Sequence, residues 1–182
     1  MKKMLIYILG IVIIALVGCT NTSMTKNEVL INRTKFDIIQ DELKEIPKDY
    51  DLEEGINKGH LILSYDNRNL DINILNRFIE DSSKGVSSEI IIVQYTIEGD
   101  PILTKLKYDG KSYYGAIDTT RDKFGVGDYY MFEYLYLKSY KNNNEDIYYL
   151  VNDNALTNDD IESILKSEEN YNAMYLFTIN NM

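Results

Sequence analysis

The residues EIIIVQYTIEGDPILTKLKYDGKSYYGAID, numbers 89–118, decide the fold. β-Branched and aromatic side chains dominate this segment, and they favour the pleated surface of a sheet. Two turn sequences interrupt it, Gly99-Asp100-Pro101 and Asp109-Gly110. Asp-Gly is typical of a type I′ turn, in which both central residues have positive φ. We therefore predict three antiparallel strands at residues 89–97, 102–108 and 111–117. Pro101 is expected to start an edge strand.

Three further strands, a loop and a helix are predicted downstream. Residues 129–140 and 147–151 are rich in tyrosine and flank the polar loop 141–146, which predicts a second hairpin. Thr157 and Asp160 fit the capping box that begins a helix. The apolar face of that helix is formed by Ile161, Ile164 and Leu165, with Leu156 packing before it. Residues 175–179 are predicted as a closing strand.

Upstream, apolar residues recur at helical spacing between a cap at Thr34 and a stop at Pro47: Phe36, Ile39, Leu43 and Ile46. A second helix is predicted behind Asp71, with the apolar face Ile74, Leu75, Phe78 and Ile79. Between them we predict a helical turn at 52–57, a short strand at 60–65 and a turn at 66–69. The expected fold is α+β, a single small domain at 31–182 with a mainly antiparallel sheet and two to three packed helices.

The first residues have the pattern of an export signal. Lys2 and Lys3 precede 14 uncharged residues, 4–17, and small residues follow. Leu16-Val17-Gly18-Cys19 resembles the lipobox of bacterial lipoproteins, which implies cleavage before Cys19 and a diacylglycerol on its thiol. A short membrane helix is the alternative, but a span needs about 20 apolar residues. We expect a signal peptide at 1–18, a lipidated Cys19 with a flexible tether at 19–30, and anchoring to the outer face of the cytoplasmic membrane.

The composition excludes several classes of function. The 182 residues include 19 Lys and Arg against 29 Asp and Glu, a net charge of −10, so we expect no nucleic-acid partner. A single Cys excludes a disulfide framework and cysteine-rich metal sites, and a single His excludes sites built from several histidines. We expect no cofactor and no metal.

Three groups of residues could carry chemistry. His60 lacks an accompanying G-x-S-x-G motif, which favours a histidine at a strand end over a catalytic one. A run of acidic residues before Gly55 suggests a calcium loop, but the glycine and glutamate spacing of an EF-hand is absent, so a helix start or a solvated acidic face is favoured: Asp49, Asp51, Glu53 and Glu54. Glu98 and Asp100 could form the carboxylate pair of a glycosidase, although a turn also explains them.

Tyrosine is the clearest compositional bias, with 16 residues. Packing in a sheet is the simplest explanation, and recognition of a sugar or a protein is the alternative. Spacing of two along a predicted strand places four rings on one face: Tyr130, Phe132, Tyr134 and Tyr136.

The middle of the chain resembles a known family. The segments YTIEGDPI, LKYDGKSYYGAID and TRDKFG follow one another between Tyr95 and Gly125. Together they resemble the Domain of Unknown Function 4362 family, small lipoproteins of Gram-positive bacteria, with a likeness over residues 50–125. Asn57-Lys58-Gly59-His60 departs from the acidic Gly-Asp of that family. The resemblance implies an envelope lipoprotein with a small α+β domain and no known activity. Its motifs supply the candidate binding residues Glu98, Gly99, Asp100, Pro101, Tyr108, Asp109 and Gly110.

We therefore expect a non-catalytic interaction or binding module, held at the membrane through lipid on Cys19. Its partner is an envelope protein or glycan, contacted through the tyrosine-rich sheet or the acidic turns. A carboxylate-based envelope hydrolase and a weak calcium-dependent binding module are the alternatives.

Overall fold

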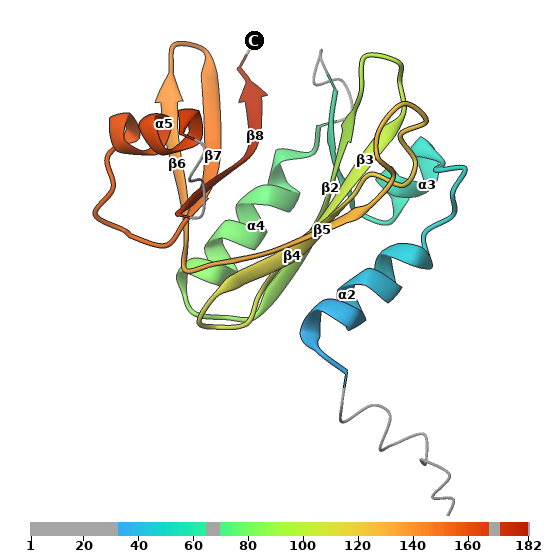
Figure 1. Ribbon diagram of the computed structural model, residues 1–182, viewed down its shortest axis with the longest axis horizontal. Helices are drawn as coiled ribbons and strands as arrows, with labels where there is room; N and C mark the ends of the chain where they lie inside the picture. Colours follow the sequence, from blue (N-terminus) through green and yellow to red (C-terminus); the bar gives the residue numbers. More distant parts are fainter. Residues whose placement is uncertain (1–32, 65–69, 168–171, 182) are drawn as a thin grey trace, which may run out of the picture. The chain divides into compact units, whose positions relative to one another are not determined.

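A computed structural model of the chain describes residues 33–64, 70–167 and 172–181, and Thr34–Met182 is a compact unit (Figure 1). The predicted signal peptide at 1–18, Cys19, the tether at 19–30 and the turn at 66–69 lie outside the described residues. The described part of the chain forms four helices and eight strands, and the strands make two sheets. The predicted α+β class is confirmed.

Residues 89–118 form the centre of a five-stranded sheet with the order β1-β2-β3-β4-β5. The predicted antiparallel meander is confirmed as β2, β3 and β4; β5 adds another antiparallel strand, and β1 lies parallel to β2. The strands are β1 (Leu61–Leu63), β2 (Ser88–Tyr95), β3 (Pro101–Tyr108), β4 (Tyr113–Asp118) and β5 (Tyr129–Tyr134).

β3 is an interior strand, because it pairs with β2 on one side and with β4 on the other. The prediction that Pro101 starts an edge strand is therefore wrong. Pro101 is the first residue of β3 and stands opposite Tyr95. At that position the missing N–H removes no hydrogen bond from the middle of the ladder.

A second, antiparallel sheet has the order β6-β7-β8 and consists of β6 (Tyr136–Asn142), β7 (Glu145–Val151) and β8 (Ala173–Asn180). The predicted hairpin between β6 and β7 is confirmed. The single strand predicted at 129–140 is wrong, because the chain bends at Leu135 and changes sheets. There the Leu135 N–H donates to the Val151 carbonyl at 3.2 Å.

The bend also separates the four aromatic rings expected on one face. Phe132 is buried in the core, and Tyr134 is partly buried against it. Tyr130 remains exposed on β5, and Tyr136 is exposed on β6 in the other sheet. Two of the four rings therefore pack in or against the core, and the other two reach the surface.

The helices begin at the predicted caps. α2 (Lys35–Lys44) follows Thr34 and α5 (Asn158–Lys166) follows Thr157, each with a capping box. α4 (Ile72–Ser83) follows Asp71, and the predicted helical turn is α3 (Leu52–Asn57). None of the helices in the described part of the chain is long and apolar enough to cross a membrane.

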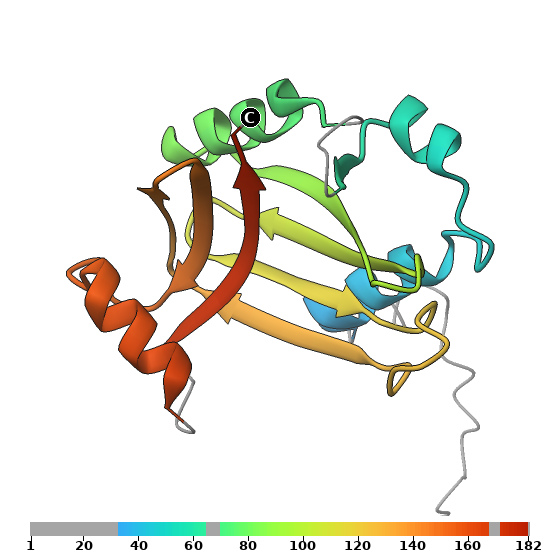
Figure 2. The same cartoon turned by 90° about the horizontal axis from the view of Figure 1, so that it is seen from above.

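The helices cover the sheets in layers (Figures 1 and 2). α2 packs through Ile39 and Leu43 on one face of the five-stranded sheet, and α4 packs through Leu75 and Phe78 on the other face. The three-stranded sheet lies on the α4 side, so the two sheets and α4 share one hydrophobic core. α5 covers the outer face of the three-stranded sheet through Ile161.

Candidate functional site

The EGDPI residues form the turn between β2 and β3. Gly99 has φ +88°, a conformation that residues with a Cβ rarely adopt, and its N–H donates to the Thr96 carbonyl at 3.0 Å. The Thr96 N–H donates to the Asp100 carbonyl at 2.9 Å, and the Thr96 hydroxyl accepts from the Asp100 N–H at 3.1 Å. Glu98 is exposed and has no hydrogen-bond or ion-pair partner among the described residues. The turn is therefore built by Thr96, Gly99 and Asp100.

The carboxylate of Asp100 fastens this turn to the loop between β4 and β5. Lys123, in the RDKFG segment, donates its backbone N–H to Asp100 Oδ2 at 3.1 Å and its ammonium to Oδ1 at 2.9 Å. These hydrogen bonds hold the pKa of Asp100 below the usual range of an aspartate. Asp100 is therefore ionised at neutral pH, and both of its oxygens are engaged.

The same loop is tied to the segment after α2 by the buried side chain of Arg121. Arg121 and Asp118 are both buried and form a salt bridge. The Arg121 guanidinium also donates to the Ile46 carbonyl at 2.6 Å and to the Pro47 carbonyl at 3.1 Å, just beyond the end of α2. A buried guanidinium is tolerated when its N–H groups are satisfied in this way. The loop thus has fixed attachments at both Arg121 and Lys123.

Three apolar side chains project from the two loops that the Asp100–Lys123 contact joins. The exposed fraction is 100% for Ile97, 79% for Phe124 and 83% for Val126. Both views of the molecule place the β2–β3 turn beside the β4–β5 loop (Figures 1 and 2). Ile97, Phe124 and Val126 are called the loop tips below. Single exposed apolar residues are ordinary, whereas a group on adjoining loops marks a candidate contact surface.

The YDG residues lie at the opposite end of β3, roughly 24 Å away at about 3.4 Å per residue. The β3–β4 hairpin is confirmed, but its predicted type I′ turn is wrong. Gly110 has φ +94°, whereas Asn143 is the one described residue other than glycine with positive φ. Asp109 instead accepts hydrogen bonds on Oδ1 from the N–H groups of Lys111 and Ser112, both at 2.9 Å. This side-chain turn gives a four-residue connection between β3 and β4.

A groove of about 340 Å³ opens beside Tyr108, where the end of α4 and the β3–β4 turn meet β6 and β7. Tyr113 and Tyr148 are buried in its lining, and Tyr136 is exposed. The Tyr108 and Tyr113 rings pack with centroids 4.6 Å apart. Lys111 and two serines at the end of α4 supply polar groups. We call this the tyrosine groove.

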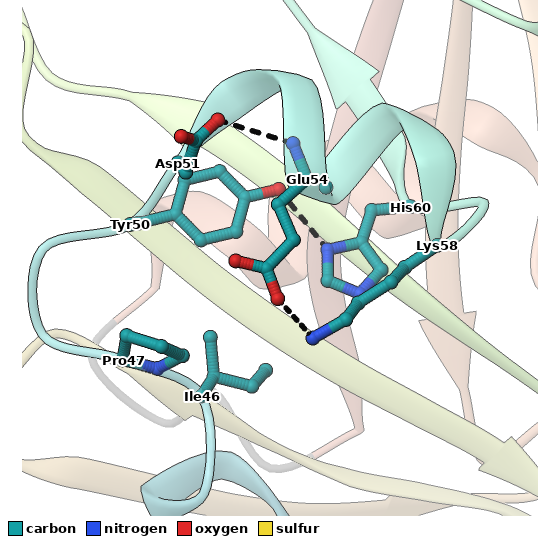
Figure 3. A pocket seen from close by; sticks show the side chains of 8 residues that line it. Ile46, Pro47, Tyr50, Asp51, Glu54, Lys58 and His60 are labelled. Atoms are coloured by element: carbon teal, nitrogen blue, oxygen red, sulfur yellow. Dashed lines mark hydrogen bonds and ion pairs between the residues drawn. The ribbon is translucent and has the colours of Figure 1, made fainter.

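His60 lies in a small pocket between α3 and β1 (Figure 3). It is buried, and its Nδ1 is hydrogen-bonded to the Tyr50 hydroxyl at 3.0 Å. A Cβ at Gly55 would lie 1.8 Å from that hydroxyl, so a larger residue there would displace the Tyr50 ring from His60. Burial, with a contribution from Lys58, lowers the pKa of His60. With about 10 Å³, the cavity has room for about one water molecule.

The acidic residues near Gly55 serve the start of α3. Asp51 accepts from the Glu54 N–H as the N-cap, and Glu54 forms an ion pair with Lys58 (Figure 3). Over the described ranges, no group of three or more His, Cys, Asp or Glu side chains is arranged to hold a metal ion.

Comparison with protein families gives one match. The family model described as "Domain of unknown function (DUF4362)" matches residues 60–149. Residues 60–149 therefore belong to this family. Comparison with curated proteins and with solved structures gives no match. The DUF4362 match begins later than the likeness expected from residue 50 and ends beyond residue 125, so it takes in β5, β6 and much of β7.

The DUF4362 domain does not gather its predicted site residues in one place. Glu98, Gly99, Asp100 and Pro101 lie at one end of β3, and Tyr108, Asp109 and Gly110 lie at the other. Asp100 does not pair with Glu98 through a shared contact but binds Lys123. The contribution of Lys123 was missed by sequence reasoning, although it stands in the RDKFG segment that helped to identify the family. The exposure of Phe124 and Val126 could not be predicted from the sequence, apart from their place in a polar loop.

Proposed function

We propose that this protein is a non-catalytic binding protein, anchored by lipid on Cys19 to the outer face of the cytoplasmic membrane, and that it contacts an envelope protein through the loop tips. The observation that supports this proposal most directly is the exposure of Ile97, Phe124 and Val126, which are 79–100% exposed. They stand on two loops that Asp100 and Lys123 hold together. Exposed apolar groups on a rigid support can enter a partner without a large cost of ordering the loops.

The charges around the loop tips favour one kind of partner. Glu98 is exposed beside Ile97, and Asp128 is exposed near Val126, while Lys123 is engaged by Asp100. An acidic rim is repelled by an anionic bilayer and by a second copy of the same surface. It complements an apolar pocket bordered by Lys and Arg side chains. A partner protein with such a pocket is therefore the proposed occupant.

The state of Asp100 supports the non-catalytic part of the proposal. A general acid needs a raised pKa, whereas Lys123 lowers that of Asp100. The carboxylate oxygens also accept hydrogen bonds from Lys123 that a substrate would have to replace. The sequence pattern at Leu16-Val17-Gly18-Cys19 supports the anchor, because two acyl chains are enough for stable attachment.

The test is photo-crosslinking in intact cells of the full-length protein with benzoylphenylalanine in place of Phe124. We expect a discrete protein adduct whose crosslinked peptide is rich in Lys and Arg. The matched control carries the same group in place of Tyr175, which is exposed on β8 in the other sheet. Ile97→Ser combined with Val126→Ser should remove the adduct from position 124. Adducts only with lipid, only with a second copy, or equally from both positions would contradict the proposal.

A further inference from the structure

We propose that the tyrosine groove is a separate binding site for a short saccharide that carries a negative charge. It lies at the YDG end of β3 and does not include the loop tips. The tyrosine groove is therefore separate from the surface that carries the function proposed above.

The aromatic lining of the groove fits the faces of sugar rings. Four tyrosines contribute to it, two of them buried and therefore fixed in position: Tyr108, Tyr113, Tyr136 and Tyr148. Tyr148 is further held by stacking on Phe177, with centroids 4.7 Å apart. Tyrosine offers an apolar ring and a hydroxyl at little cost in conformational entropy. A sugar ring presents the same combination of C–H faces and hydroxyl groups.

Polar groups of the groove are available to a ligand. The hydroxyls of Tyr136 and Tyr148 have no hydrogen-bond partner among the described residues. Ser82 and Ser83 donate their hydroxyl protons to the carbonyls of Ile79 and Glu80, at 3.1 and 2.7 Å. Ser82 is buried and also forms a side-chain hydrogen bond with Tyr113, whereas the exposed Ser83 oxygen keeps lone pairs that can accept from sugar hydroxyls.

The charge of the groove indicates an acidic ligand. Lys111 is exposed, has no ion-pair partner within the described ranges, and is the one charged residue in the lining. The whole chain has a net charge of −10, so a groove with a lysine and no lining carboxylate differs from the rest of the protein. An ammonium beside aromatic rings and hydroxyls matches a sugar with a carboxylate or a phosphate.

The size limits the ligand to a short segment. About 340 Å³ is at the small end of the range for ligand pockets, which begins near 300 Å³. One or two sugar units fit such a volume. A longer chain would have to continue past the exposed Tyr136 into solvent.

Two pairs of sugars distinguish recognition of the negative charge from recognition of the sugar ring. N-acetylmuramic acid differs from N-acetylglucosamine by a carboxylate-bearing lactyl group, and glucose 1-phosphate differs from glucose by a phosphate. Each is titrated into the full-length chain in an uncharged polyoxyethylene detergent, which has no sugar headgroup, and binding is followed by saturation-transfer NMR. The variants are Lys111→Gln, Tyr136→Ala and the control Lys48→Gln, which removes an exposed lysine outside the groove lining.

We expect at least one acidic sugar to bind about fivefold more tightly than its neutral counterpart, the size of an exposed ion pair. Lys111→Gln should abolish this difference, Lys48→Gln should keep it, and Tyr136→Ala should weaken both members of the pair. The pair with the larger difference identifies the acid as carboxylate or phosphate. Absence of saturable binding, or equal binding of acidic and neutral sugars that is unaffected by Lys111→Gln, would overturn the proposal.

Discussion

Lys123 donates to both carboxylate oxygens of Asp100, through its backbone N–H at 3.1 Å and its ammonium at 2.9 Å. The two residues come from different loops, 23 positions apart in the sequence. This contact unites the EGDPI and RDKFG segments of the family at one end of the five-stranded sheet, and it fixes the loops that carry the tips.

The Asp100–Lys123 contact predicts a defined dependence of stability on pH. The pKa of Asp100 is lower in the folded protein than its ordinary value of about 3.9, so the ionised group stabilises the fold above about pH 4. This contribution is lost as the pH falls through the folded pKa. At pH 7, Asp100→Asn should therefore have a lower free energy of unfolding than the wild type. Near pH 2.5, the difference in free energy between the two proteins should be smaller.

Urea unfolding of the full-length chain at each pH measures this effect. Glu98→Gln is the matched control. It removes a carboxylate from the same turn, and this carboxylate has no partner among the described residues. Parallel pH profiles for the wild type and Asp100→Asn would show that the contact does not stabilise the fold.

His60 predicts a second pH dependence in a different range. Burial and Lys58 hold its pKa below the ordinary value of about 6.5, so the unfolded chain binds a proton more readily than the folded one. The free energy of unfolding should fall as the pH is lowered from about 7.5 towards the folded pKa. Because His60 is the single histidine of the chain, His60→Asn should flatten the profile in this range. A slope that persists in the variant would assign the titration to another group.

Gly110→Val should destabilise the protein by about 1–3 kcal/mol, because a β-branched residue is strained at φ +94°. A Cβ at this position would also lie 3.4 Å from the Gly85 carbonyl oxygen. Lys111→Ala, one position further and without positive φ, is the control. Urea unfolding compares the two variants, and an unchanged midpoint for Gly110→Val would mean that the turn adapts without strain.

Cys19→Ala should abolish incorporation of a fatty-acid probe and leave an uncleaved precursor, because Cys19 is the single thiol in the chain. Metabolic labelling followed by mass measurement of the mature protein tests this. Label retained in the variant, or a mature N-terminus elsewhere, would refute lipid anchoring at this position.

The parts of the fold that depend on neighbouring residues could be predicted from the sequence. Thr34 with Asp37 and Thr157 with Asp160 begin helices through contacts three residues apart. The meander of β2, β3 and β4 follows from apolar runs separated by short turns. In these cases the local pattern and the final structure agree.

The parts that depend on distant contacts could not be predicted. The strand break at Leu135 arises where the chain joins a second sheet, and nothing in a continuous aromatic run marks it. Asp109 was expected to take a positive φ, but its carboxylate accepts two backbone N–H groups and stabilises another turn. The pairing of Asp100 with Lys123, and the groove between the sheets, exist only after the chain has folded.

The central claim is tested most directly with the partner protein that crosslinks to position 124. Once it has been purified, its affinity is measured for the wild type and for Phe124→Ser. We predict that Phe124→Ser weakens binding at least about tenfold, as expected for an aromatic side chain that becomes buried in the complex. Tyr175→Ser should bind as the wild type does, and added salt should weaken binding because the rim is acidic. Equal affinity of Phe124→Ser and the wild type would contradict binding through the loop tips.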